Sequence, residues 1–145
     1  MSGQPLSEQV AHEIEKLIRI QLANSYRHEL RPAQWQALRF FAKADPRERT
    51  LTGFARHRRS TIGTTSITVS QLVDRGYLER GDPNGQRNVD LRVSEKGLQA
   101  LRHDPMKELE DALDRLSEPQ RDQLLAGLKL VNETLDPHNG DSASA

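Results

Sequence analysis

Cysteine is absent from the 145-residue sequence, which excludes disulfide bonds, zinc sites made of thiolates and redox sensing by a thiol. Aromatic residues are scarce, at 4% of the chain, and hydrophobic residues reach only 34%. One copy can therefore bury only a thin core, and the leucine-rich segments at both ends predict that a partner chain completes it. Long apolar runs and a signal-like N-terminus are also missing, so we expect a cytoplasmic protein with no membrane partner.

Enzyme and metal-site motifs are missing as well. The sequence contains no nucleophile elbow, no phosphate-binding loop and no HExxH motif. Its five histidines have no short metal-ligand spacing. We therefore expect that the protein is not an enzyme and that it holds neither a metal nor another cofactor.

The charge is balanced overall but uneven along the chain. The formal net charge is zero, yet residues 47–59 contain five arginines and one glutamate, and residues 102–136 contain nine acidic and five basic residues. A basic middle region is typical of a surface that binds a polyanion. The alternative, which is the commoner explanation of a charge run, is a solvated face.

Hydrophobic spacing of three to four residues predicts helices through the first half of the chain. A proline opens the second of them, where its missing N–H costs least. Thr52 is the expected N-cap of the third, because threonine hydroxyls accept bonds from free helix amides. The predicted segments are Ser7–Tyr26, Pro32 to about Asp45, Gly53–Arg59, and a helix that starts at Ser60 or Thr61 and stops at Gly76.

The second half begins with a change of period. Residues 77–80 are short and extended, and Val89, Leu91 and Val93 alternate with polar residues, so this region is predicted to be a β-hairpin with a turn-rich loop. Two further helices follow. Ser94 is the predicted cap of the first.

That helix is expected to bend near Asp104–Pro105. Ser117 and Gln120 have the spacing of a capping box at the start of the last helix. The fold class that we expect is mainly α with a small β-hairpin wing (α+β). A short helix, a longer helix and a hairpin together make a winged helix-turn-helix.

The expected domain organisation follows from this order of elements. Residues 31–97 are predicted to form the winged helix-turn-helix, with residues 1–30 and 98–136 as N- and C-terminal dimerisation helices. Residues 137–145 are predicted to be a disordered tail, because they are mainly Asn, Gly, Ser and Ala.

The segment STIGTTSITVSQLVDRG, residues 60–76, is rich in hydroxyls for a helix. At 100° per residue Ile62, Thr65, Val69 and Leu72 share one side, which we expect to pack inward. The opposite side is small and uncharged, so it could approach base edges in a DNA major groove, where Ile67 could contact a thymine methyl. The alternative is an ordinary exposed polar face, where Glu and Lys would be expected. The candidate DNA-binding residues on the outward side and its flanks are Thr61, Gly63, Thr64, Ser66, Ile67, Ser70 and Gln71.

With these residues the sequence resembles the MarR family of bacterial transcriptional regulators. The resemblance rests on LVDRGYLER (72–80), on DPNGQRNVDLRVSEKG (82–97), on the Pro32/Trp35/Leu38 helix and on the leucine-rich helices near the C-terminus. It covers roughly residues 7 to 135. It implies a homodimeric repressor whose terminal helices intertwine and whose two winged helices bind successive half-sites of a palindromic operator in double-stranded DNA.

The resemblance also implies roles for basic residues. Arg87 would lie at the wing tip and reach the minor groove, although Gly85 stands where the family's wing usually has an aspartate that braces this arginine. Asp82 or Asp90 could substitute for it. Independently of the resemblance, the residues at the end of the third helix would contact phosphates, or else complement the dipole at a helix C-terminus; they are Arg56, His57, Arg58 and Arg59.

Two further alternatives stay open. Arg75 would contact a phosphate or form a structural ion pair. Many relatives respond to small aromatic ligands, and His12, Tyr26, Trp35 and Arg39 could line such a ligand site, unless Trp35 is simply part of the core. A winged-helix module that binds a protein partner and not DNA is the alternative function.

Overall fold

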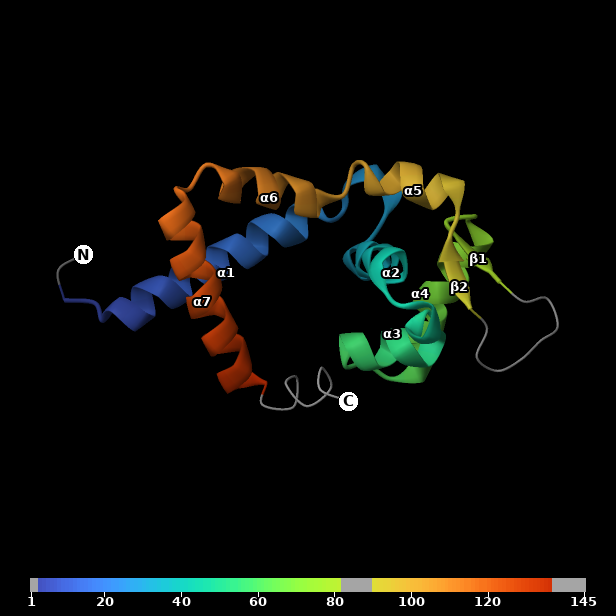
Figure 1. Cartoon of the computed structure of the whole chain (residues 1–145), viewed down its shortest axis with the longest axis horizontal. Coiled ribbons are helices and arrows are strands. Elements are labelled where there is room, and N and C mark those ends of the chain that lie inside the picture. The colour runs from blue at the N-terminus through green and yellow to red at the C-terminus, as the bar shows by residue number, and fades with distance from the viewer. Residues whose placement is uncertain (1–2, 82–89, 137–145) are drawn as a thin grey trace. The chain divides into compact units, whose positions relative to one another are not determined.

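A computed structural model describes residues 3–81 and 90–136 of the chain (Figure 1). The chain divides into two units between Pro105 and Met106, and each unit is described by itself. The elements in chain order are α1 (Leu6–Asn24), η1 (Arg27–Glu29), α2 (Pro32–Lys43), η2 (Pro46–Glu48), α3 (Leu51–Arg58), α4 (Ile62–Asp74), β1 (Leu78–Arg80), β2 (Leu91–Val93), α5 (Glu95–Leu101), α6 (Pro105–Asp114) and α7 (Glu118–Leu135). The predicted fold class, mainly α with a small β-hairpin, is confirmed.

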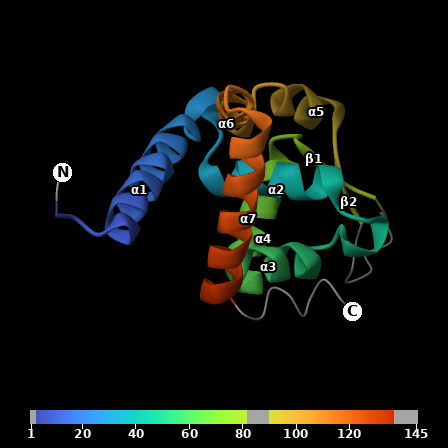
Figure 2. The same cartoon turned by 60° about the vertical axis from the view of Figure 1, so that its left-hand side comes forward.

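The core of the first unit lies between α2, α3, α4 and the hairpin, which Figures 1 and 2 show beside one another. From α2 come Trp35, Leu38 and Phe41, all at most 2% exposed. Phe54 of α3 packs against Phe41 with ring centroids 5.4 Å apart. The remaining members of this core cluster are Leu30, Ala37, Val69, Leu72, Tyr77, Leu78 and Leu91. This core fixes the positions of α3 and α4 relative to each other.

Threonine caps start both α3 and α4. The hydroxyl of Thr50 accepts from the backbone N–H of Gly53 at 3.0 Å, so Thr50 caps α3 and the expected cap, Thr52, was wrong. The helix starts two residues earlier than predicted, because Thr50 is extended and Leu51 already has helical geometry. Thr61 caps α4 by accepting from Thr64 N–H at 3.2 Å, which confirms one of the two predicted starts.

The end of α4 leads directly into the hairpin. Gly76 has a φ of +81°, a left-handed conformation that glycine adopts at little cost. Strands β1 and β2 then pair antiparallel, with Leu78 opposite Val93. The predicted hairpin is therefore confirmed. Its loop, residues 82–89, and with it Val89, lies outside the described residues.

Ser94 connects the hairpin to α5. Its hydroxyl accepts from Gly97 N–H at 3.1 Å, as the sequence predicted for an N-cap, and donates to the carbonyl of Gly76. A Cβ at Gly97 would lie 2.4 Å from the carbonyl oxygen of Tyr77. Only glycine at this position lets α5 approach the start of the hairpin so closely.

The bent helix that the sequence predicted near Asp104–Pro105 is in fact two helices. Helix α5 ends at Leu101 and α6 begins at Pro105. The break has a local cause, because proline disfavours helical geometry in the residue before it. Asp104 is held instead by Arg39 of α2, with Nη1 and Oδ1 2.6 Å apart.

Helix α7 belongs to the second unit and starts with the predicted capping box. Gln120 N–H donates to the Ser117 hydroxyl at 3.3 Å, and Ser117 N–H donates to Gln120 Oε1 at 2.9 Å. Within the described ranges, no helix of the chain is long and apolar enough to cross a membrane.

Candidate nucleic-acid interface

Helix α4 is held by one face against α2, α3 and β1. That face consists of Thr65, Thr68, Val69 and Leu72, each at most 8% exposed. Thr65, Val69 and Leu72 were predicted to face inward, and this is confirmed. Thr68, which was assigned to neither face, is buried beside them.

Ile62 was predicted to pack inward and does not, since it is 53% exposed. The first buried residue of α4 is Thr65, three positions later. Angular position places Ile62 near the inner face, but the first turn extends beyond the core that α2 and α3 supply. An aliphatic side chain at the start of α4 is therefore open to solvent.

The opposite face of α4 carries the candidate DNA-binding residues. Ile67 lies near its centre and is 62% exposed. A Cβ added at Gly63 would meet nothing within 4 Å beyond its own helix and chain neighbours in the described chain. The other predicted residues are Thr61, Thr64 and Gln71, which are exposed, and Ser66 and Ser70, which are half-buried. The surface they form is small, open and uncharged.

Gln71 is the only amide on this face, and it has a partner inside the protein. Its Oε1 accepts from Nε2 of Gln34 at 3.2 Å. Gln34 itself is 5% exposed and its Oε1 accepts from the N–H of Arg31. The Gln71 side chain is therefore partly oriented toward α2.

The three arginines proposed to contact phosphates differ in their surroundings. Arg58 is half-buried, with its guanidinium 5.6 Å from the ring centroid of Phe54. Arg59 is exposed and has a φ of 57°, so it sits in the left-handed turn between α3 and α4.

Arg75 has partners in its own chain. Its Nη1 donates to the carbonyl of Glu29 at 3.1 Å, and its guanidinium lies 5.2 Å from the ring centroid of Tyr77. The structural alternative for Arg75 was an ion pair, and its Nη2 lies 4.0 Å from Oε2 of Glu29. These contacts tie the C-terminal end of α4 to the connection between α1 and α2.

The wing arginine, Arg87, and Gly85 lie outside the described residues. At the base of the wing, Asp90 accepts from Nε of Arg92 at 2.7 Å, and its other oxygen is 3.3 Å from Nε of Arg49. Asp90 therefore braces two arginines at the base of the hairpin, one of which precedes α3.

The four candidate ligand residues lie in different environments. Trp35 is fully buried in the core, which agrees with the alternative given for it, and Arg39 is paired with Asp104, itself 6% exposed. Tyr26 is 62% exposed, and His12 is an exposed residue of α1. A ligand site made by these residues stays a prediction.

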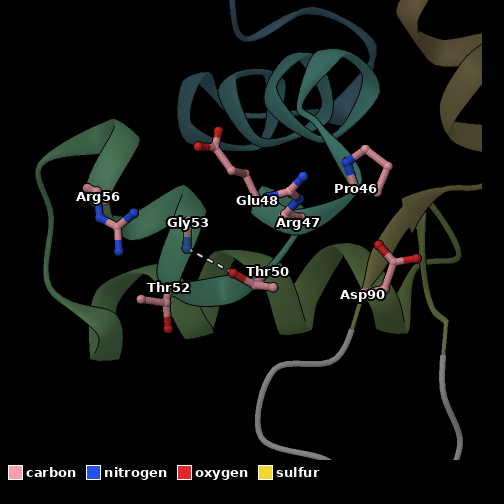
Figure 3. A pocket seen from close by; sticks show the side chains of 8 residues that line it. All are labelled: Pro46, Arg47, Glu48, Thr50, Thr52, Gly53, Arg56 and Asp90. Carbon is pink, nitrogen blue, oxygen red and sulfur yellow. Dashed lines mark hydrogen bonds between the residues drawn. The ribbon is translucent and has the colours of Figure 1, made fainter. Parts of the chain in front are cut away.

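An open cavity of about 380 Å³, which the sequence did not predict, lies beside the start of α3 (Figure 3). The walls of this cavity come from η2, α3 and the base of the wing, so the sequence alone could not place them together. The arginine-rich composition of residues 47–59 was the only feature of the sequence that pointed to this region. Two arginines and two carboxylates line the cavity, so its charge is mixed. The lining residues are Pro46, Arg47, Glu48, Thr50, Thr52, Gly53, Arg56 and Asp90.

Comparison with known proteins shows which solved structures share this fold. No protein-family model and no curated protein matches the sequence. Solved structures do match it. Staphylococcus aureus MarR in complex with salicylate and kanamycin is 18% identical, covers 90% of this chain and 92% of its own, and superposes with a TM-score of 0.73.

Two further structures extend the comparison. A probable transcriptional regulator from Pseudomonas aeruginosa is 23% identical, covers 88% of this chain and 99% of its own, and has a TM-score of 0.64. A mutant of S. aureus MepR bound to an oligodeoxyribonucleotide is 17% identical, covers 92% of this chain and 99% of its own, and has a TM-score of 0.61. The chain therefore has the fold of the MarR-type winged-helix regulators, over nearly its whole length.

Proposed function

We propose that the protein is a sequence-specific DNA-binding transcriptional regulator of the MarR type. The observation that carries the proposal is the outward face of α4, which is exposed, uncharged and lined with small side chains, on a helix that a complete core holds in place. A major groove about 12 Å wide admits a helix whose outer side chains are small. An ordinary exposed helix would carry Glu and Lys on this face, and α4 has neither.

Residues on and around α4 would have two different roles in DNA binding, contact with base edges and contact with phosphates or the minor groove. Hydroxyls of Thr61, Thr64, Ser66 and Ser70 can donate to or accept from base edges. Arg58 and Arg59, and Arg87 on the wing, would supply charge toward phosphates and the minor groove, which strengthens binding without reading sequence in the major groove.

Formation of a homodimer would explain why the terminal helices, α1 and α7, carry exposed apolar residues. Neither α1 nor α7 buries any of its described residues in the single chain. Large exposed apolar residues lie on both of these helices: Leu6, Val10, Leu17, Ile18, Ile20 and Leu22 on α1, and Leu124, Leu125, Leu128, Leu130, Val131 and Leu135 on α7. Soluble chains rarely leave so much apolar surface open, so we propose that a second copy covers it.

In this arrangement the protein acts as a repressor by occlusion. The two α4 helices of a dimer would enter successive major grooves of a palindromic operator, with half-sites about 10 bp apart. Salicylate is present in the S. aureus MarR structure. By analogy we propose that a small aromatic ligand changes the separation of the two α4 helices, and so the fit to the operator.

Selection of bound DNA from a random pool tests the proposal. A palindrome with half-sites about one helical turn apart is the expected result. Affinity for the selected DNA should fall steeply with salt, because phosphate contacts release counterions. Absence of any DNA binding at low salt would contradict the proposal and would favour a winged-helix module that binds a protein partner.

A further inference from the structure

The outward face of α4 lacks the side chains that read guanine. Guanine is recognised most often by Arg or Lys bonded to its O6 and N7 atoms. No Arg or Lys occurs from Thr61 to Asp74. Arg75 follows directly, but it is bonded to Glu29 and lies over Tyr77. Helix α4 therefore has no cation with which to select a guanine.

The same face is poorly equipped to read adenine. Adenine is read by an Asn or Gln that both donates to and accepts from the base. Gln71 is the single amide from Thr61 to Asp74, and its oxygen already accepts from Gln34 at 3.2 Å. An amide oxygen can accept two hydrogen bonds, but the bond to Gln34 turns the Gln71 side chain toward α2, and this orientation competes with the usual two-bond pairing with adenine.

Two isoleucines remain as the large side chains on the exposed part of α4. Ile62 is 53% exposed and Ile67 is 62% exposed, whereas Val69 and Leu72 on the same helix are at most 2% exposed. Neither isoleucine belongs to the core cluster. Burial of an aliphatic side chain against another apolar group is favourable, and thymine supplies the one apolar group in the major groove, its 5-methyl.

The spacing of the two isoleucines suits two different base pairs. Five residues of helix correspond to about 7.5 Å along the axis, which is close to two base steps of about 3.4 Å. Ile67 lies at the centre of the outward face, and Ile62 lies at the exposed start of the helix. The two side chains also lie about 140° apart around the helix, so Ile62 can reach a base only because it lies in the first turn, where N-terminal residues of a recognition helix contact base edges. In that arrangement each isoleucine would contact a methyl on a separate base pair.

We propose that α4 reads its half-site mainly through the 5-methyl groups of thymines, contacted by Ile67 and Ile62, rather than through hydrogen bonds to guanine. This inference rests on the proposed DNA-binding function and specifies its sequence preference. The hydroxyls around the isoleucines then add bonds that tolerate several bases. Thymine is the predicted determinant at the positions that α4 contacts.

Replacement of thymine by deoxyuridine tests this directly, because it removes the 5-methyl and keeps the base pair. The full-length protein is first used to select an operator. Synthetic operators then carry deoxyuridine at one thymine position of each half-site at a time, and dissociation constants are measured by fluorescence anisotropy. At the positions read by α4 we expect a loss of about fourfold for each methyl removed.

The variant Ile67→Ala supplies the matched measurement. At the position that Ile67 reads, deoxyuridine should weaken the wild-type protein and leave Ile67→Ala unaffected, as a double-mutant cycle requires for a direct contact. Ile62→Ala should lose its sensitivity at a different position. Gln99→Ala, at an exposed position of α5 outside the proposed DNA-binding residues, serves as the control and should keep the wild-type response to deoxyuridine. Since both isoleucines are exposed, the variants should fold, which circular dichroism can verify.

Three results would overturn the inference and leave the regulator intact. They are a selected half-site without thymine, no loss with deoxyuridine at any position, and an equal loss in the wild type and both isoleucine variants. Absence of binding to every duplex at low salt would overturn the proposed function as well. The two failures are therefore distinguishable.

Discussion

The helices that form the winged-helix core and the terminal helices solve the burial of apolar residues in different ways. Helix α2 buries five of its twelve residues and α4 buries four of its thirteen. Helices α1 and α7, with nineteen and eighteen residues, bury none within the described chain. Both terminal helices nevertheless carry six large exposed apolar residues each.

This difference indicates that the two regions owe their stability to different sources. The core around Trp35 is closed by residues of one chain, so its stability should not depend on protein concentration. The apolar faces of α1 and α7 need a second surface, and their contribution should rise with concentration by mass action. The predictions below test this contrast, from the largest expected effect to the smallest.

Trp35→Ala should have the largest effect on the free energy of unfolding. The side chain is fully buried and belongs to the core cluster of the first unit, and its loss leaves a cavity that costs about 3–5 kcal/mol. Chemical denaturation followed by circular dichroism measures it. The loss should be the same at low and high protein concentration, and a loss that vanishes at high concentration would contradict the contrast.

Leu128→Glu on α7 should instead act on association. Leu128 is 39% exposed in the single chain, and a buried charge at a dimer interface should raise the dimer dissociation constant at least about tenfold. Analytical ultracentrifugation measures this. The control is Lys129→Glu on the polar side of the same helix. Equal effects of the two variants would show that this face of α7 is not an interface.

Removal of one serine N-cap in each region should give smaller losses of stability that can be compared. Ser94 is 6% exposed and its hydroxyl both accepts from Gly97 N–H and donates to Gly76. Ser117 caps α7 in the same way but is exposed. Ser94→Ala should cost about 2 kcal/mol, and Ser117→Ala about 0.5–1 kcal/mol. Urea titrations of both variants measure the loss in the free energy of unfolding. A larger loss for Ser117→Ala would contradict the expectation that the buried cap, Ser94, contributes more to stability.

The features predictable from the sequence were those set by neighbouring residues. The caps Ser94 and Ser117, and the stop of α4 at Gly76, depend on local hydrogen bonds and backbone preference. The cap of α3 was misplaced from Thr50 to Thr52, because two threonines offer the same chemistry two residues apart. Which of the two threonines caps the helix depends on which residue is the first with helical geometry, and that residue is Leu51.

Features that depend on distant segments could not be predicted in the same way. Periodicity placed Ile62 on the inner side of α4 but says nothing of how far the core extends along the helix axis. The cavity at η2 and α3 needs residues as distant as Arg47 and Asp90 to meet. The outward face of α4 was predictable because one helix supplies all of it, and its exposed residues agree with the prediction, although their contacts with DNA are untested.

The smallest expected effects distinguish two arginines near α4. Arg59→Gln should reduce the slope of log affinity against log salt by about one, because an exposed arginine in the turn between α3 and α4 is placed to contact a phosphate. Arg75→Gln should leave that slope unchanged, because Glu29 and Tyr77 already hold the guanidinium. It should instead lower stability by less than about 1 kcal/mol. Salt titrations of operator binding with both variants measure the slopes. A reduced slope for Arg75→Gln would show that Arg75 contacts a phosphate in the complex. Its hydrogen bond with Glu29 would then be present only in the protein without DNA.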